Sequence, residues 1–365
     1  MKIPVTLSLY ICKQFLTCVG VILGLLIAII MIFDVVDLLG RTSDKDVPLR
    51  IVIDMLLMKF PNEVQLVIPY TILLGSMMAY SRLTRNSELI VMRSAGFSAW
   101  QFLMPSALTA ALMGVAMVTM LNPLSAIMLK RYERFEGKYL KGKTSEFTVS
   151  SSGLWLQEVV PGAEGKTVIY ALRISQEKKA LYDITLFRFN NQHDFIKRYD
   201  AKMATLIPNR WVLRNVLITS PGIPAQRYDT FEVPTTVKFA HIQDSFASPD
   251  TITFWELEGF IQTLKDAGFS ALRHLVHWHS LLSRPFFLCA LVYIGAAFSF
   301  NPPRKRGVAI LFSTGILLGF LIHFLSDVVG ALGGSGVILP IVAAWTPVAI
   351  TGILGIFMIL HLEDG

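Results

Sequence analysis

The sequence predicts an α-helical membrane protein with six transmembrane helices, three before and three after an inserted all-β domain of jelly-roll type. Three observations lead to this fold class. Of the 365 residues, 53% are hydrophobic and only 16% are charged, with a mean hydropathy of +0.55; soluble domains carry about 25% charged residues. Six apolar runs are long enough to cross a bilayer. A polar section with strand-like segments separates the third run from the fourth.

The apolar runs match the length of about 20 residues that a membrane helix needs. They cover 15–39, 62–80, 100–129, 278–300, 308–329 and 337–360. The first run is longer than a signal-peptide core and has no small-residue cleavage site, so we interpret it as an uncleaved span. The sequence thus predicts three parts: 1–129 with three spans, 130–276 as the β domain, and 277–365 with three more spans.

Lysine and arginine in the short loops predict that both termini are cytoplasmic. With the N-terminus inside, segments 2–13, 82–93 and 304–306 place most loop cations in the cytoplasm, and the outer loop near 330–336 has none. A basic cluster from Lys130 to Lys143 opposes this trend. The net charge of +7 does not indicate nucleic acid binding, because the basic residues sit beside the spans and no nucleic-acid-binding motif is present.

The polar section predicts a sandwich or jelly roll of short strands. Five β-rich runs, separated by Gly, Pro or Asn, cover 167–174, 181–189, 195–206, 210–219 and 235–241. Side chains alternate along 211–219, so one face of that strand would line an apolar slot. A capping-box pattern at Thr253 and Glu256 then opens a closing helix over about 253–268.

A short charged segment, Arg82 to Trp100, lies between the second and third spans. Ser87 followed by Glu88 is a helix start signal and Gly96 is a stop signal, which predicts a helix over about 84–96. A charged helix of this length cannot cross a bilayer. We expect it to lie at a membrane surface, where a soluble protein could push on it.

The segment Gly137–Thr144 matches the pattern G-x-x-x-x-G-K-[ST] of nucleotide-binding P-loops. A working P-loop follows a buried strand and opens a helix whose N-terminus holds the phosphates. Here a charged helical continuation of the third span precedes the match, and a strand-like run follows it. We interpret the match as coincidental and predict that this chain binds no cofactor.

Several polar and small residues near the spans have two interpretations each. His274, His277 and His279 could be zinc ligands, but their spacing and the missing fourth ligand favour polar residues at a membrane entry. His323 and Asp327 share one helix face and could relay protons; residues at the rim of a wet cavity are the preferred interpretation.

Two G-x-x-x-G pairs, Gly20–Gly24 and Gly315–Gly319, could let helices approach closely. The basic cluster after the third span is either a solvated helix end or a docking rim for an anionic headgroup.

At this point the sequence resembles a known family. Pro61–Ser98, PNEVQLVIPYTILLGSMMAYSRLTRNSELIVMRSAGFS, resembles the second span and coupling helix of the LptF/LptG permeases. Thr253–Gly268 resembles the end of their periplasmic domain, and His279–Phe286 the start of their fourth span. The three-plus-three plan extends the resemblance over nearly the whole chain, and Gly153-Leu154-Trp155 is more similar to the LptG branch.

The resemblance implies a non-catalytic permease subunit of an ABC transporter. Such a subunit extracts lipopolysaccharide from the bacterial inner membrane and passes it to a periplasmic bridge. ATP would be used by a cytoplasmic ATPase dimer, a second permease of the family would complete a heterodimer, and a single-span LptC-like periplasmic protein would take part. The β domain would be periplasmic.

The resemblance also implies roles for individual residues. The residues that would couple to the ATPase are Arg82, Arg85, Glu88, Met92, Arg93 and Gly96. The lipid headgroup would bind at Lys130, Arg131 and Arg134, whereas the first span offers Asp34 and Asp37 where relatives carry basic residues. The glycines at the subunit interface would be Gly20, Gly24, Gly315 and Gly319.

Two other classes of function stay open. A membrane-embedded lipid-modifying enzyme would need a nucleophile or metal set near a span end, where His323 with Asp327 is the one tempting pair. A proton-driven secondary lipid transporter would need acidic groups near the bilayer midplane and broken helices, whereas the acids here lie near the rims. ATP dependence of transport separates both from an ATP-driven permease.

Overall fold

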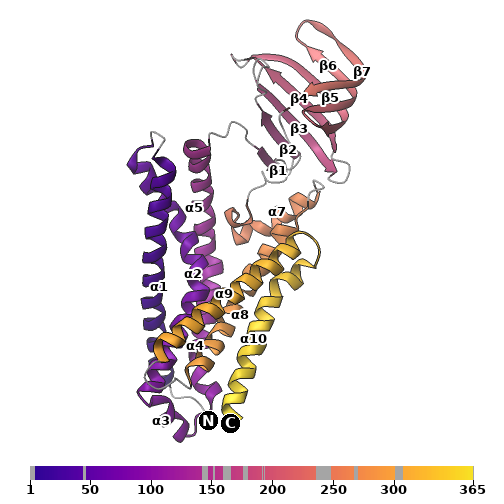
Figure 1. The fold of residues 1–365 in the computed structure, drawn as a ribbon. Coiled ribbons are helices and arrows are strands. Elements are labelled where there is room, and N and C mark those ends of the chain that lie inside the picture. Colours follow the sequence, from indigo (N-terminus) through magenta and orange to yellow (C-terminus); the bar gives the residue numbers. More distant parts are fainter. Residues whose placement is uncertain are drawn as a thin grey trace. The chain divides into compact units, whose positions relative to one another are not determined.

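The structure is a computed structural model, shown in Figure 1. It describes residues 5–43, 47–141, 147–150, 153–158, 166–175, 180–190, 192, 194–235, 248–266, 270–300 and 307–364. The chain forms two compact units. The helical unit contains Met1–Phe135, Pro249–Trp255 and Leu272–Gly365, and the β unit contains Glu136–Ser248 and Glu256–Ala271.

The helical unit is a bundle whose long helices alternate in direction (Figure 1). Its helices are α1 (Val5–Thr42), α2 (Leu49–Arg85), α3 (Glu88–Ser94), α4 (Ala99–Ala116), the π-helix η1 (Met117–Leu121), α5 (Asn122–Phe135), the 3₁₀ turn η3 (Pro249–Thr251), α8 (Leu272–Ser299), α9 (Gly307–Gly334) and α10 (Pro340–Asp364). The short helix α3 lies at the end of the bundle where α1 begins and α10 ends (Figure 1).

Five of the described helices are long and apolar enough to cross a membrane. They are α1, the continuous helix Ala99–Leu140, α8, and the segments Ile310–Gly334 of α9 and Pro340–His361 of α10. They confirm five of the six expected spans. The helix at the remaining position, α2, is 37 residues long but does not belong to this group. A helix that neighbouring helices cover needs fewer apolar side chains than one that faces lipid.

The second half of α2 is buried at the centre of the helical unit. Its Tyr80 hydroxyl donates to Ser106 Oγ of α4 at 2.8 Å, and its Met77 carbonyl accepts from Ser299 Oγ of α8 at 3.0 Å. A Cβ atom at Gly295 of α8 would collide with Ser76 of α2. The lack of a side chain at Gly295 therefore sets how closely the two helices approach.

The third span is one long helix with an irregular middle. It begins at Ala99, after Ser98, whose N–H donates to Gln101 Oε1 at 3.2 Å. The π-helix η1 interrupts it, and α5 continues past the expected end at 129 to Phe135. The first residues of the P-loop-like match fall in a second π-helix, η2 (Glu136–Lys141), whereas Gly142–Thr144 lie outside the described residues.

The expected all-β domain is confirmed, with one antiparallel sheet of seven described strands. They are β1 (Phe147–Ser150), β2 (Gly153–Glu158), β3 (Lys166–Ser175), β4 (Ala180–Phe189), β5 (Phe195–Ile207), β6 (Arg210–Ser220) and β7 (Ile223–Pro234). Each strand pairs with the next in the chain. The described order is thus an up-and-down meander and not the Greek-key order of a strict jelly roll, because short turns such as Pro208–Asn209 join antiparallel neighbours.

The strict alternation expected along 211–219 is wrong, because β6 is irregular at Asn215. This residue has φ 58°, while the register with β5 is the same on both sides of it, with the pairs Met203–Arg214 and Ala201–Val216. The buried side chains are consequently Trp211, Leu213 and then Val216. A residue with positive φ departs from the extended geometry of a strand, so the alternation of side chains is interrupted at Asn215 without an extra residue.

The closing helix α7 (Phe254–Asp266) begins directly after Thr253, as the capping pattern predicts. It buries Leu257, Ile261 and Leu264, which lie on one face at helical spacing. Gly268, its expected end, lies outside the described residues, as does most of the predicted strand 235–241.

Candidate functional site

The first candidate site is α3, a helix of seven residues with one buried and one exposed face. Leu89 and Met92 are buried in the same core as Leu83 of α2. Ile90 and Val91 point the other way, and each is 64% exposed. The turns on either side hold two left-handed residues, Ser87 at φ 60° and Gly96 at φ 83°. The chain therefore turns sharply at both ends of α3.

The charged residues of this segment differ in their contacts with the rest of the bundle. The carboxylate of Glu88 accepts from the Tyr10 hydroxyl of α1 at 2.8 Å and from the Asn86 amide at 3.2 Å. The guanidinium of Arg93 lies 5.7 Å from the centre of the Phe300 ring, where a cation–π contact forms. Arg82 and Arg85 are exposed. Glu88 thus joins α3 to α1, and Arg93 joins it to the end of α8.

The structure divides the residues predicted for coupling. Arg82, Arg85, Arg93 and Gly96 are exposed, Glu88 is half-buried, and Met92 is in the core. The exposed apolar pair is Ile90 and Val91, which sequence reasoning omitted. Leu89 and Met92 are three residues apart, and this spacing marks the buried face and could have identified the exposed one.

The second candidate site is the basic rim, formed by Lys130, Arg131 and Arg134 on α5. All three side chains are exposed, whereas Tyr132 between them is buried. None of the three forms an ion pair with another residue in the part of the chain that the structure describes. Because α4 and α5 are one continuous helix, the rim lies at the opposite end of the bundle from α3 (Figure 1).

A partly buried charge cluster lies at the same end of the bundle as the rim, between α1 and α2. Lys59 Nζ is 2.6 Å from Asp34 Oδ1 and 3.0 Å from Glu63 Oε1. Asp37 pairs with Arg41 at 3.5 Å on the surface of α1. Asp34 of the first span therefore forms an ion pair with Lys59 of the second span, and Glu63 is a second carboxylate partner of the same lysine.

The two glycine pairs lie in different surroundings. Gly315 and Gly319 of α9 are covered by α2: a Cβ at Gly315 would lie 2.5 Å from Met77 Sδ, and one at Gly319 would lie 3.2 Å from Tyr70 Cδ1. Gly20 and Gly24 are exposed, with nothing within 4 Å of a Cβ at either. Packing within the chain accounts for the α9 pair, so only the α1 pair stays available for a subunit interface.

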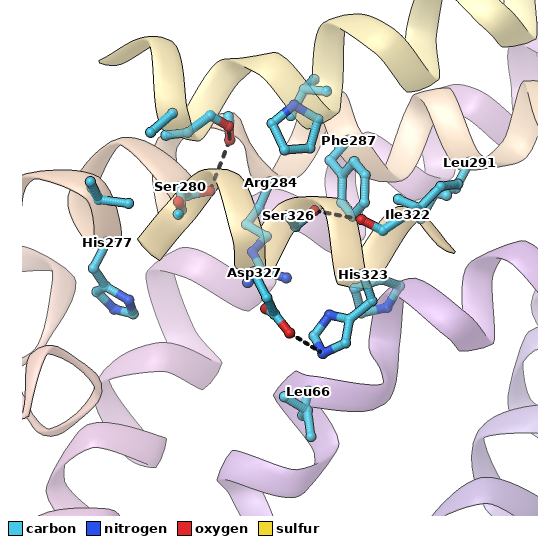
Figure 2. A pocket seen from close by; sticks show the side chains of 18 of the residues that line it. Leu66, His277, Ser280, Arg284, Phe287, Leu291, Ile322, His323, Ser326 and Asp327 are labelled. Carbon is cyan, nitrogen blue, oxygen red and sulfur yellow. Dashed lines mark hydrogen bonds and ion pairs between the residues drawn. The ribbon is translucent and has the colours of Figure 1, made fainter. Parts of the chain in front are cut away.

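A cavity of about 320 Å³ lies inside the helical unit, among α2, α8, α9 and α10 (Figure 2). His277 Nδ1 is 3.3 Å from Asp250 Oδ1, and His323 Nε2 is 3.4 Å from Asp327 Oδ2. Arg284 also lines the cavity. The predicted rim residues His323 and Asp327 thus lie at a cavity, with 43% and 66% of their side chains exposed.

Two serine hydroxyls of the cavity form hydrogen bonds within their own helices. The Ser283 hydroxyl donates to the Ser280 carbonyl at 3.0 Å, and the Ser326 hydroxyl to the Ile322 carbonyl at 2.9 Å (Figure 2). These hydroxyls are directed to backbone carbonyls and not to a base. Within the described ranges, no three His, Cys, Asp or Glu side chains gather as a metal site.

Comparison with known proteins gives a consistent result. The family described as "Lipopolysaccharide export system permease LptF/LptG" matches residues 9–361. The LptG permease protein of Escherichia coli (strain K12) is 24% identical over 364 residues, which cover 97% of this chain and 98% of that protein. The LptG of Haemophilus influenzae is 23% identical over 290 residues, 74% of each chain. The LptF of E. coli K12 is 32% identical over 89 residues, 24% of each chain.

Proposed function

The chain belongs to the LptF/LptG family of lipopolysaccharide export permeases. From this premise we propose which of its surfaces contacts the ATPase and which binds the lipid. Members of this family are permease subunits of the lipopolysaccharide export system. The apolar helices of this chain fit a multi-pass membrane protein. We propose that it is the LptG-type subunit of a heterodimer in the bacterial inner membrane. The longer alignment to LptG than to LptF supports that assignment.

We propose that α3 transmits the movement of a cytoplasmic ATPase dimer to the bundle. The observation that carries this proposal is the exposed pair Ile90 and Val91 on a helix whose other face is core. Arginines at 82, 85 and 93 surround this pair with positive charge. Such a surface suits a groove with an apolar floor and an acidic edge. ATP is then hydrolysed by the partner and not by this chain.

The test of this contact is a double substitution, Ile90→Asp with Val91→Asp, in the coexpressed complex. Two charges would be buried in the groove without partners, and the copurified ATPase should fall at least tenfold, which corresponds to about 1.4 kcal/mol. Arg50→Glu, on an exposed residue of α2 at the other end of the bundle, is the matched control. Undiminished ATPase recovery with the double variant would contradict the proposal.

Glu88 has a different role in this scheme. Glu88→Lys breaks the bond with Tyr10 and adds a like charge beside Arg85, so it should lower transport-coupled ATP hydrolysis. Tyr10→Phe removes the same hydrogen bond and leaves the exposed face of α3 unchanged. If Tyr10→Phe lowers coupling as much as Glu88→Lys, then Glu88 positions the helix. If only Glu88→Lys lowers it, then Glu88 contacts the ATPase.

At the opposite end, we propose that the basic rim receives the phosphorylated headgroup of lipopolysaccharide. This placement requires cytoplasmic termini and a periplasmic β unit, from which the lipid passes to a single-span LptC-like partner and a bridge. Exposed cations without ion-pair partners among the described residues support the proposal. Each charge-assisted contact contributes about 1.5–3 kcal/mol.

The experiment reverses two rim charges together, Lys130→Glu with Arg131→Glu. Lipid export by the complex in vesicles should fall more than tenfold, and basal ATP hydrolysis should persist, because the ATPase contact lies across the bundle. Arg50→Glu changes the charge at the same end without touching the rim. Normal export by the double variant, or an equal loss with Arg50→Glu, would reduce the rim to a solvated helix end.

A further inference from the structure

The cavity in the helical unit contains an arginine whose charge has no close partner in the described structure. Arg284 lies inside α8, before Pro285. Its guanidinium makes no hydrogen bond, and no ion pair within 4.0 Å, with any residue that the structure describes. The negative charges of Asp250 and Asp327 attract the guanidinium from a distance. Each of these carboxylates also lies beside a histidine, His277 and His323 respectively.

The two acids also lie farther out than the arginine. The side chains of Asp250 and Asp327 are 56% and 66% exposed, whereas Arg284 is partly buried. Figure 2 shows His277, Arg284, His323 and Asp327 along the cavity between α8 and α9. One ring nitrogen of His277, Nε2, is buried and has no hydrogen-bond partner. A guanidinium inside a membrane protein is costly when no acceptor contacts it directly, and Asp250 and Asp327 both lie beyond 4.0 Å of it. Phosphate oxygens in contact with Arg284 would supply the missing hydrogen bonds.

The other part of the cavity is apolar. Leu73 of α2, Phe287 and Leu291 of α8, and Ile322 of α9 line it. A guanidinium fork binds phosphate oxygens in pairs, and an apolar slot beside it accepts a hydrocarbon chain. The cavity thus combines a site for an oxyanion with a site for an acyl chain, which is the chemistry of an anionic amphiphile.

We propose that this cavity binds part of one phospholipid of the surrounding membrane, with its phosphate at Arg284 and a segment of one acyl chain beside Phe287 and Leu291. Arg284 lies six residues after Trp278, so it is about 9 Å further along the helix than this aromatic residue. Tryptophan is common at the level of the headgroups, and a long arginine side chain reaches back toward that level.

The proposed lipid is a resident component and not the exported cargo. A volume of about 320 Å³ is at the lower end of the range for small-ligand sites. It accommodates part of a single chain, whereas lipopolysaccharide carries several chains on one headgroup.

The first experiment uses the purified permease complex in nanodiscs that contain phosphatidylglycerol with a photoreactive acyl chain. Cross-links are mapped to single residues by mass spectrometry. Leu291 is only 2% exposed, so bulk lipid cannot reach it and a cross-link there reports an occupied cavity. We expect a cross-link at Leu291 in the wild-type protein. Cross-links confined to outward residues of α9, such as Phe320, would overturn the proposal.

Substitutions at the polar end then test the role of the arginine. Arg284→Gln should lower labelling of Leu291 about tenfold, the effect of losing one charge-assisted contact. Arg284→Lys keeps the positive charge but loses the two-pronged guanidinium. Labelling of Leu291 in this variant should therefore lie between that of the wild type and that of Arg284→Gln. Arg50→Gln removes an exposed arginine of α2 and should leave labelling unchanged. Equal labelling in Arg284→Gln and the wild type would overturn the proposal.

A third variant and a competitor complete the test. Ile322→Phe fills the apolar end without changing charge, so it should also lower labelling of Leu291 if Arg284→Gln fails to fold. Undiminished labelling in a folded Ile322→Phe variant would contradict an acyl chain at this end. Inorganic phosphate at 10 mM concentration, roughly the affinity range of weak anion sites, should not displace the lipid. Loss of labelling with phosphate would show a free-anion site instead.

Discussion

The two G-x-x-x-G pairs have the same sequence pattern and opposite surroundings. On α9, Gly315 and Gly319 face α2, and the large side chains Ile316 and Phe320 point outward. On α1, the large side chains Phe15 and Val19 point inward, and Gly20 and Gly24 point outward. The pattern therefore marks a place where a helix can approach closely. Only the structure shows whether that helix belongs to the same chain.

The largest effect is expected when the buried pair is filled. Gly315→Leu places a side chain where even a Cβ lies 2.5 Å from Met77 Sδ, so α9 must move away from α2. Overpacking of this kind costs about 1–3 kcal/mol. The melting temperature of the isolated chain in detergent should fall clearly. Ile316→Leu, at the exposed neighbour, is the control and should melt like the wild type; a similar melting temperature for both variants would refute the intrachain contact.

A smaller effect, of a different kind, is expected on α1. Gly24→Leu meets nothing within this chain, so the isolated chain should melt normally. A second permease that packs on this face could no longer approach, and its recovery in pull-downs should fall about tenfold, or about 1.4 kcal/mol. Val21→Leu changes an exposed residue of the same helix outside the glycine pair. Full recovery of the partner with Gly24→Leu would remove α1 from the interface.

The smallest effect, a gain in stability, should be found for only one of the two pairs. Glycine inside a helix is about 0.5–1 kcal/mol less favourable than alanine. Gly20→Ala should therefore stabilise the isolated chain slightly, because the new methyl group is unobstructed. Gly315→Ala should show no such gain, since its methyl group must displace the flexible end of Met77. Thermal unfolding of the two variants under one condition measures the difference, and equal gains would mean that the α9 contact is loose.

Local patterns predicted much of the fold. The four strands from β3 to β6 lie within one or two residues of the expected runs, because alternation and turn residues are visible in the sequence. The strands β1, β2 and β7 were not among the expected runs. For β7 the reason is visible in its residues. Its sequence IPAQRYDTFEVP begins and ends near prolines, and most of its side chains are exposed. Edge strands tolerate proline and polar residues, so they carry little apolar pattern.

The candidate sites depended more on tertiary structure. The short helix was expected from 84, but α2 continues to Arg85 and α3 begins only at Glu88. The exposed pair Ile90 and Val91 could be recognised only once the buried face was known. The cavity combines Arg284 of α8 with residues of α2, α9 and α10, and no local pattern brings these together. An arginine within an apolar run was the one available signal.

The central position of α2 has a consequence for the order of synthesis. Part of its buried face, with Ser76, is covered by α8, which the ribosome makes only after the strands of the β unit. At bacterial rates of translation the interval is on the order of 10 s. During that time the first three helices occupy the bilayer with polar groups of α2 still uncovered. We expect the nascent N-terminal half to need a membrane chaperone, and chains that stop before α8 to be degraded.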